Sequence, residues 1–293
     1  QQTVAALDKK RDEYRVFTMS FSSNVLSIEK QGQVGIIYLD RESKYNALST
    51  ELWSTIPLGL AALCEDPEIG AIVLAGRGKH FCAGIDLAED GLSQHKKAKA
   101  RSKAEANIQQ LHNTQKFQQA ISSLAECELP VIAVVQGFCL GAGVDLITAC
   151  DMRIASACSV FSVRETRLGL VADVGTLQRL PKILNAGHVA ELAYTGKDIK
   201  ADRAEKIGLV NDVYESAEAT MEAGMALAQE IAGNSPMAVR GTKFVLRQSE
   251  NLTDEQSLMV NGMYTLMTSL QSNDLQEGIM AFAERRPAKF TGS

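Results

Sequence analysis

The sequence predicts an α/β fold in which buried strands alternate with helices, followed by a region built from helices. Short apolar runs at 34–39, 71–74 and 131–135 are typical of strands covered on both faces. Helical patterns at 49–64 and at about 96–124 separate these runs. Strands that alternate with helices indicate crossover connections between them.

Local sequence features predict where individual helices and strands lie. The helix at 49–64 begins where Ser49 can cap it, with Leu52 as an early apolar position. Further strand-like runs follow at 152–155 and 209–213. The densest apolar stretch, 130–147, is interrupted by glycine and polar residues, and no run approaches the ~18–20 residues of a membrane helix.

After about residue 215 the pattern becomes helical. The expected helices span 217–232, 236–248, 253–270 and 274–283. Pro236 directly follows the capping residue Ser235, which is the typical order at a helix start. Methionines recur every fourth residue, at Met259, Met263 and Met267. Such a stripe predicts either core packing or a subunit interface.

Composition narrows the function classes. The 293 residues are 45% apolar and 22% charged, with a net charge of −5 and a pI of about 5.5, which argues against a general nucleic-acid or anionic-membrane binder. The six cysteines and four histidines lack metal-site spacing, so we expect no metal and interpret the cysteines as buried, reduced thiols. With no signal-peptide pattern in 1–20 and no Ser-Lys-Leu end, we expect a cytoplasmic protein.

Two glycine-bearing stretches follow predicted strands, at 80–87 and 136–146. Ligands usually bind at the carboxyl ends of strands in α/β folds. Gly141-Ala142-Gly143 leads into a helix, whose first N–H groups have no intrahelical partner. Such a terminus suits a phosphate or a developing oxyanion, although a tight turn with close helix packing explains the glycines equally well.

Three acids stand in largely apolar surroundings: Asp145, Glu165 and Asp173. Burying an ionised carboxylate costs several kcal/mol unless it is compensated, and burial raises the pKa toward the working pH. Carboxyl groups of this kind often serve proton transfer. Helix capping, an ion pair with a nearby arginine or simple exposure are the alternatives.

Three ordered motifs resemble the enoyl-CoA hydratase/isomerase (crotonase) superfamily. They are Phe81-Cys82-Ala83-Gly84-Ile85-Asp86-Leu87, the run from Gly137 to Asp145, and Asp151-Met152-Arg153-Ile154-Ala155. The resemblance extends from about residue 25 to 290. It implies a ClpP/crotonase-like spiral of repeated ββα units with a helical C-terminal region, and no metal or redox cofactor, since coenzyme A is part of the substrate.

Within this superfamily the chain is most similar to the Δ3,5-Δ2,4-dienoyl-CoA isomerase subgroup. The similar stretches are 143–151 and 169–182, and the subgroup's three acids are spaced as in Asp145, Glu165 and Asp173. Hydratases usually have Glu at the first of these positions and Gly at the third. The resemblance therefore implies an isomerase of unsaturated fatty-acid β-oxidation rather than a hydratase.

The resemblance also implies roles for single residues. The backbone N–H groups of Ile85 and Ala142 would form an oxyanion hole for the thioester. Relatives often have glycine at position 142, but alanine can supply the same donor if its φ is negative. Asp173 would remove the C2 proton, Glu165 would protonate C6, and Asp145 would tune both; an exchange of the first two roles is left open.

Coenzyme A contacts are implied at several positions. They are Gly84, Ile85, Asp86, Leu87 and Ala88, then Lys44 and Ala47, and at the C-terminus Lys289 and Phe290, often from a neighbouring subunit. The expected organisation is a tail at 1–22, a spiral core at 23–215 and a helical oligomerisation region at 216–293. Relatives form trimers or dimers of trimers, so we expect a homo-oligomer.

Two alternatives are retained. An enoyl-CoA hydratase of the same superfamily would need Asp145 in place of glutamate. A non-catalytic, RNA-binding homologue would use the basic run of Lys96, Lys97, Lys99, Arg101 and Lys103, but this run lacks aromatic residues and the protein is acidic. We therefore expect no nucleic-acid partner and no membrane partner.

Overall fold

The computed structural model describes residues 21–88 and 101–293. Within them, the main sheet has six strands in the order β1-β2-β3-β4-β6-β9. These strands are β1 (Leu26–Gln31), β2 (Val34–Leu39), β3 (Ala71–Gly76), β4 (Val131–Val135), β6 (Met152–Ser156) and β9 (Asp212–Tyr214). Only the β1–β2 pair is antiparallel among these neighbours. The other pairings are parallel, as the continuous apolar runs predict.

A smaller sheet lies beside the first. It contains β5 (Phe138–Leu140), β7 (Val160–Ser162) and β8 (Ile199–Lys200). The chain passes from β4 to β5 and from β6 to β7, so a strand of the main sheet is followed each time by a strand of the small one. A bridge between Cys82 and Cys139 adds the segment after β3 to this pattern. The repeated units confirm the predicted spiral.

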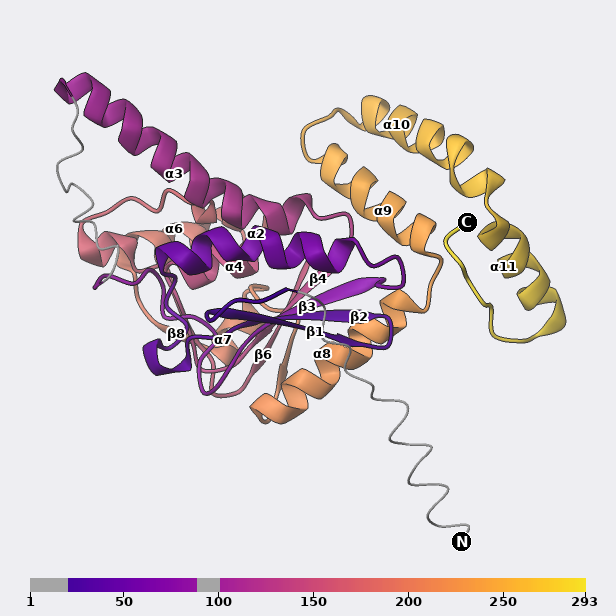
Figure 1. The fold of residues 1–293 in the computed structure, drawn as a ribbon, viewed down its shortest axis with the longest axis horizontal. Coiled ribbons are helices and arrows are strands. Elements are labelled where there is room, and N and C mark those ends of the chain that lie inside the picture. Colours follow the sequence, from indigo (N-terminus) through magenta and orange to yellow (C-terminus); the bar gives the residue numbers. More distant parts are fainter. Residues whose placement is uncertain (1–20, 89–100) are drawn as a thin grey trace, which may run out of the picture.

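Helices cover both faces of the main sheet, and the last helices of the chain lie to one side of it (Figure 1). The helices are α2 (Thr50–Cys64), α3 (Lys103–Glu126), α4 (Ala142–Ala149), α5 (Thr176–Ile183), α6 (Ala186–Thr195), α7 (Ala201–Lys206), α8 (Ala217–Ala232), α9 (Pro236–Ser249), α10 (Asp254–Met267) and α11 (Asn273–Glu284). Short 3₁₀ turns occur at η1 (Glu42–Lys44), η3 (Glu165–Leu168) and η4 (Ser269–Gln271).

Alternate strand residues bury against opposite faces of the main sheet. Ile72 and Leu74 of β3 belong to the cluster that contains residues of α2, α3 and α4. Val73 of the same strand belongs to the cluster with Met225 and Ala228 of α8. Helix α8 therefore closes the second face of the core, although the sequence-based boundary at residue 215 groups it with the C-terminal helices.

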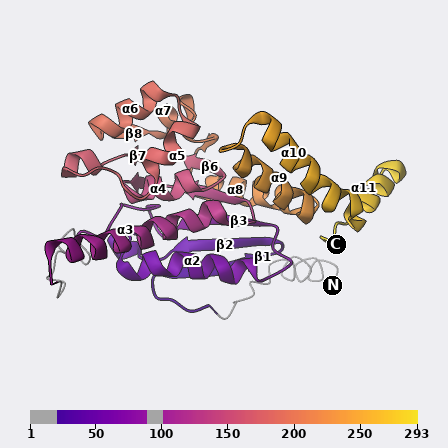
Figure 2. The same ribbon diagram turned by 90° about the horizontal axis from the view of Figure 1, so that it is seen from above.

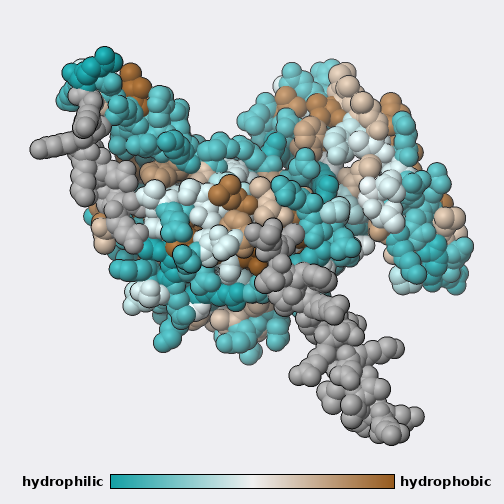
Figure 3. Space-filling view, viewed as in Figure 1, coloured by the Kyte–Doolittle hydropathy of each residue, from teal (hydrophilic) through white to brown (hydrophobic). Residues whose placement is uncertain are grey.

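Helices α9, α10 and α11 extend away from the core (Figure 2). Met259, Met263 and Met267 on α10 are all more than half exposed. Their interpretation as core packing is therefore wrong for the single chain. Figure 3 shows apolar side chains exposed over these C-terminal helices.

Most predicted elements agree with the structure, with informative differences. Ser49 caps α2 by accepting a hydrogen bond from the Leu52 amide. The expected strand at 209–213 is shorter and later, because Leu209 and Val210 are buried in the preceding loop. The expected helix from residue 96 begins at Lys103, and its predicted part at 96–100 lies outside the described residues. Two of the six cysteines, Cys64 and Cys158, are exposed, so the buried interpretation is wrong for them.

The contact between α8 and the sheet can be tested at Gly224. A Cβ there would overlap Cγ2 of Val134 and lie 3.3 Å from Cδ1 of Ile154. Gly224→Val should therefore lower the free energy of unfolding by about 1–3 kcal/mol, measured by urea denaturation. The matched control is Gly187→Val on α6, where a Cβ would meet its nearest atom at 3.7 Å. Equal stability of both variants would contradict the tight α8 packing.

Candidate active site

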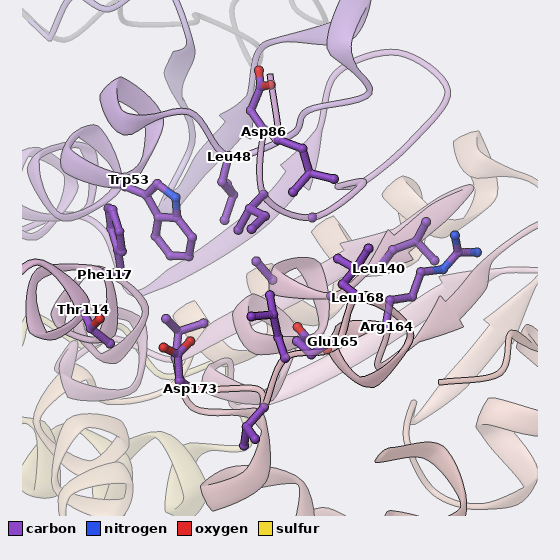
Figure 4. A pocket seen from close by; sticks show the side chains of 18 of the residues that line it. Leu48, Trp53, Asp86, Thr114, Phe117, Leu140, Arg164, Glu165, Leu168 and Asp173 are labelled. Carbon is purple, nitrogen blue, oxygen red and sulfur yellow. The ribbon is translucent and has the colours of Figure 1, made fainter. Parts of the chain in front are cut away.

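A cavity of about 420 Å³ opens at the carboxyl ends of the strands (Figure 4). Five segments line it: α2, α3, the loop at 83–87, the turn between β5 and α4, and the stretch from Arg164 to Val174. Trp53 of α2 and Phe117 of α3 pack against each other at one wall, with ring centroids 5.0 Å apart. The wall is apolar and suits a hydrocarbon chain.

Two backbone N–H groups in this lining have no acceptor. Leu48 N–H donates to Gly84 O at 2.8 Å and Asp86 N–H donates to Leu48 O at 3.0 Å, which leaves Ile85 N–H between them free. Ala142 is the first residue of α4, so its amide has no intrahelical acceptor. Among the described residues no acceptor is found for either amide. Both residues line the cavity.

Glycines make this arrangement possible. Gly84 has φ +101°, and a Cβ there would lie 3.1 Å from Leu140 O and 3.9 Å from the Ala142 amide nitrogen. The two loops thus approach closely only because position 84 lacks a side chain. Ala142 is not among the residues with positive φ. It therefore meets the condition under which alanine can replace the glycine of relatives.

Glu165 lies beside the Ala142 donor. Its Oε1 would be 3.3 Å from a Cβ built on Gly141, the residue before Ala142. Its Oε2 is buried without a hydrogen-bond partner in the described part of the chain. Burial raises the pKa of Glu165, and the nearby charge of Asp173 raises it further. A carboxyl group with a raised pKa holds its proton more readily and is suited to proton transfer.

Asp173 lies at the other side of the cavity, toward Thr114 and Phe117 of α3 (Figure 4). It is exposed and belongs to the loop that precedes α5. Gln118 of α3 donates from Nε2 to the Asp173 carbonyl oxygen at 2.6 Å. This hydrogen bond fixes the backbone from which the Asp173 carboxylate projects.

Asp145 is fully buried behind the cavity in α4 and is not among the residues that line it. Its Oδ1 accepts the Thr176 amide at 2.5 Å, and Oδ2 has no partner among the described residues. Burial raises the pKa of Asp145 to about 7, and the charge of Glu165 acts in the same direction. Glu165 and Asp173 thus line the same cavity. Asp145 instead binds the Thr176 amide, at the end of the loop that carries Asp173.

The expected coenzyme A residues separate into two groups. Gly84, Ile85, Asp86 and Leu87 line the cavity, whereas Ala88, Lys44 and Ala47 do not. Asp86 forms a buried ion pair with Arg41 at 2.9 Å, and Arg41 also donates to the Ala47 carbonyl. The side chain of Asp86 therefore holds the loop at 41–48 against the segment at 84–88.

The two C-terminal residues lie elsewhere in this chain. The Lys289 amide donates to Glu277 of α11 at 2.7 Å, and a Cβ on Gly278 would meet the Phe290 ring at 3.6 Å. Neither lines the cavity of its own chain. A role at a neighbouring subunit's site stays a prediction.

Sequence reasoning missed the residues that hold the acid loop from α3. Besides Gln118, Ser122 accepts a hydrogen bond from Arg179 at 2.9 Å, and Arg179 donates to Val174 O at 3.5 Å. Their polar side chains on a long amphipathic helix look like a solvated surface. The pocket-wall residues Trp53 and Phe117 likewise carry no motif.

Within residues 21–88 and 101–293, no group of three or more His, Cys, Asp or Glu side chains could hold a metal ion. In the same ranges no helix is long and apolar enough to cross a membrane.

The spiral fold and a cavity with two free amides beside two carboxyl groups define a class of enzymes that stabilise an oxyanion while moving protons. Residues 29–293 match the family model described as enoyl-CoA hydratase/isomerase. The chain belongs to this enzyme family, as the motifs predict.

Named relatives and solved structures agree with this assignment. The chain is 36% identical over 275 residues to the peroxisomal Delta(3,5)-Delta(2,4)-dienoyl-CoA isomerase of Arabidopsis thaliana, covering 93% of this chain and 99% of the relative. It is 37% identical over 254 residues to the mitochondrial Delta(3,5)-Delta(2,4)-dienoyl-CoA isomerase of Homo sapiens, covering 86% and 77%. The crystal structure of an enoyl-CoA hydratase from Bacillus anthracis matches with a TM-score of 0.83 at 30% identity, covering 92% of this chain and 100% of that chain.

Burial of Asp145 should make stability depend on pH. Its folded-state pKa of about 7 lies above the ordinary 3.8, so between these values the folded protein binds more protons than the unfolded chain. The free energy of unfolding should therefore fall as pH rises through this range, by about 3–4 kcal/mol at most from this group. The measurement is urea denaturation of wild type and Asp145→Asn from pH 4.5 to 7.5.

The stability difference between wild type and Asp145→Asn should shrink or reverse as pH rises, since asparagine does not titrate. Asp212→Asn, at an exposed carboxyl group on β9, is the matched control and should give a flat difference. A flat difference for Asp145→Asn would contradict the raised pKa.

Proposed function

We propose that this chain converts 3,5-dienoyl-CoA to 2,4-dienoyl-CoA. The observation that carries the proposal is the presence of Glu165 and Asp173 on opposite sides of one cavity that also holds the free Ile85 and Ala142 amides. A shift of two conjugated double bonds needs proton exchange at two carbons of the chain. The names of the Arabidopsis and human relatives describe the same reaction.

The proposed reaction passes through a dienolate. The thioester oxygen accepts hydrogen bonds from the Ile85 and Ala142 amides, which stabilise the negative charge as the C2 proton leaves. The electron pair from the C2–H bond delocalises over C1 to C6. Protonation at C6 then leaves double bonds at C2 and C4.

The geometry favours Glu165 as the group that exchanges the C2 proton. Its carboxyl group lies beside Gly141, next to one donor of the oxyanion hole, and C2 is bonded directly to the thioester carbonyl carbon. Asp173 lies toward the wall formed by Phe117 and Thr114, where carbons farther along the chain would lie. The family resemblance implies Asp173 as the base at C2 but leaves an exchange of roles open. We propose that exchange: Glu165 removes the C2 proton and Asp173 donates a proton to C6.

Asp145 acts through the other two acids in this proposal. Its hydrogen bond to the Thr176 amide holds the loop of Asp173, and the charge of Glu165 helps to raise the pKa of Asp145. It does not line the cavity and is a positioning residue.

The coenzyme A moiety is proposed to follow Gly84 to Ala88 and the loop that contains Lys44 and Ala47. We further propose a homo-oligomer, a trimer or a dimer of trimers, in which Lys289 and Phe290 reach a neighbouring subunit's nucleotide. The exposed apolar face of α10 supports an interface at the C-terminal helices. No cofactor enters the proposed reaction, since each step is a proton transfer.

The compartment remains a prediction. The chain is expected to be cytoplasmic from its own sequence, whereas the relatives' names state peroxisomal or mitochondrial proteins.

The first test is an ultraviolet assay with purified protein and 3,5-octadienoyl-CoA. Conjugation of the product diene with the thioester gives a new near-ultraviolet absorbance, and its fast growth is the expected result. A parallel assay with a 2-enoyl-CoA and water should show slow hydration. Hydration without the diene band would contradict the isomerase proposal and favour the hydratase, and salt-dependent RNA retention without either activity would favour the binding homologue.

Deuterium exchange should separate the roles of the two acids. In deuterium oxide, Asp173→Asn should still exchange the C2 proton of the 3,5-dienoyl-CoA while turnover falls by about 10²–10⁴-fold. Glu165→Gln should lose both C2 exchange and turnover. Mass spectrometry and proton NMR of the recovered thioester measure the exchange. Loss of C2 exchange in Asp173→Asn but not in Glu165→Gln would contradict this assignment and support Asp173 as the base at C2.

The charge of Asp173 should also be visible in the pH profile. Because this charge raises the pKa of Glu165, Asp173→Asn should move the residual C2-exchange rate profile to lower pH. Gln118→Ala is the companion variant: it frees the Asp173 backbone but keeps the charge, so turnover should fall without that shift. An unshifted profile in Asp173→Asn would contradict the electrostatic coupling.

A further inference from the structure

Two cysteine side chains meet at the ends of two helices, outside the cavity described above. Cys64 is the last residue of α2 and Cys127 directly follows α3. Their Sγ atoms lie 3.5 Å apart, although the residues are 63 positions apart in sequence. A disulfide bond needs about 2.05 Å between sulfur atoms, so a small side-chain movement would bring the pair into bonding distance.

Cys64 differs in chemical character from the buried cysteines. Burial raises the pKa of Cys82 and Cys150 to about 12 and that of Cys139 well above its usual range, which makes these thiols poor nucleophiles. The Cys64 pKa is lowered, first by the hydrogen bond with Cys127 and then by the positive charges of Arg240 and Lys243. The same hydrogen bond, together with burial, raises the pKa of Cys127. Cys64 is therefore the member of the pair better suited to attack a disulfide first.

The pair can also be reached from solvent. Cys64 is exposed. Cys127, although buried, lines a cavity of about 680 Å³ at the end of α3. Both cationic and acidic side chains line this cavity: Arg240, Lys243, Arg247, Glu126 and Glu128.

We propose that Cys64 and Cys127 form a reversible disulfide bond by exchange with a small disulfide such as oxidised glutathione. The Cys64 thiolate attacks one sulfur of the small disulfide and releases the first small thiolate, which takes the Cys127 proton. Cys127 then attacks the Cys64 sulfur and releases the second small thiolate. The two protein thiols lose two electrons and the small disulfide gains them.

The location gives the bond a structural consequence. Helices α2 and α3 lie side by side (Figures 1 and 2), and they also touch at Trp53 and Phe117 in the cavity wall. These rings stand ten or eleven residues before the cysteines, which is roughly 15 Å along each helix. The disulfide therefore pins the two helices at the end remote from the cavity and closes a long loop that contains Gly84 and Ile85.

The test begins with fully reduced protein and oxidised glutathione, with no coenzyme A substrate present. The expected result is the loss of two titratable thiols, no retained glutathione in the intact mass, and one linked peptide pair that contains Cys64 and Cys127. Dithiothreitol should reverse the change. The thermal midpoint of the oxidised form should rise by several degrees, since the cross-link restricts the unfolded chain.

Variants identify the two steps. Cys64→Ser should keep all its remaining thiols, whereas Cys127→Ala should stop at a stable glutathione adduct on Cys64. The matched control is Cys158→Ser, which removes the other exposed cysteine and should leave the linked pair intact. The proposal is overturned if wild type retains glutathione on Cys64, links other cysteines, or loses no thiols. None of these outcomes depends on isomerase activity, so they leave the proposed function unaffected.

Discussion

The hydrogen bond from the Thr176 amide to the buried Asp145 carboxylate joins the two halves of the site. Asp145 belongs to α4, the helix whose first residue, Ala142, supplies one donor of the oxyanion hole. Thr176 begins α5 and ends the loop that carries Asp173. Because Asp145 is fully buried, this bond fixes the distance between the oxyanion and the second acid more firmly than a surface contact would. Burying the ionised form of Asp145 costs free energy, and its raised pKa reflects that cost.

Helix α3 supports the same loop from the opposite side. Gln118 binds the Asp173 carbonyl, Ser122 accepts from Arg179, and Phe117 forms the apolar wall. The acid loop is thus held between α3 and α4, so an exposed carboxylate is presented at a defined place without being buried itself. Glu165 needs no such support because the 3₁₀ turn η3 directs it against Gly141. The two acids therefore lie in different environments, since Glu165 is half-buried and Asp173 is exposed.

The sequence could predict the fold and the three acids because both depend on local patterns. Continuous apolar runs identified β2, β3 and β4, and the resemblance to the isomerase subgroup identified Asp145, Glu165 and Asp173. It could not show that Asp145 lies behind the cavity, since that depends on the packing of α4 against α5. The contacts of Gln118 and Arg179 could not be predicted, because these hydrogen bonds join segments more than fifty residues apart or act on the main chain. The short strands β5, β7 and β8 were missed for the same reason, since pairing rather than composition defines them.

The α2–α3 pair connects the chemistry to a part of the molecule that the family motifs do not reach. Both helices contribute an aromatic ring to the cavity wall and a cysteine at the opposite end. The Trp53–Phe117 contact is held by dispersion and hydrophobic burial alone, so it can shift when the helices move relative to each other. A covalent bond at their remote ends limits such movement without touching the acids or the oxyanion donors. The acyl-chain wall is therefore the feature of the site through which changes at the two thiols would act.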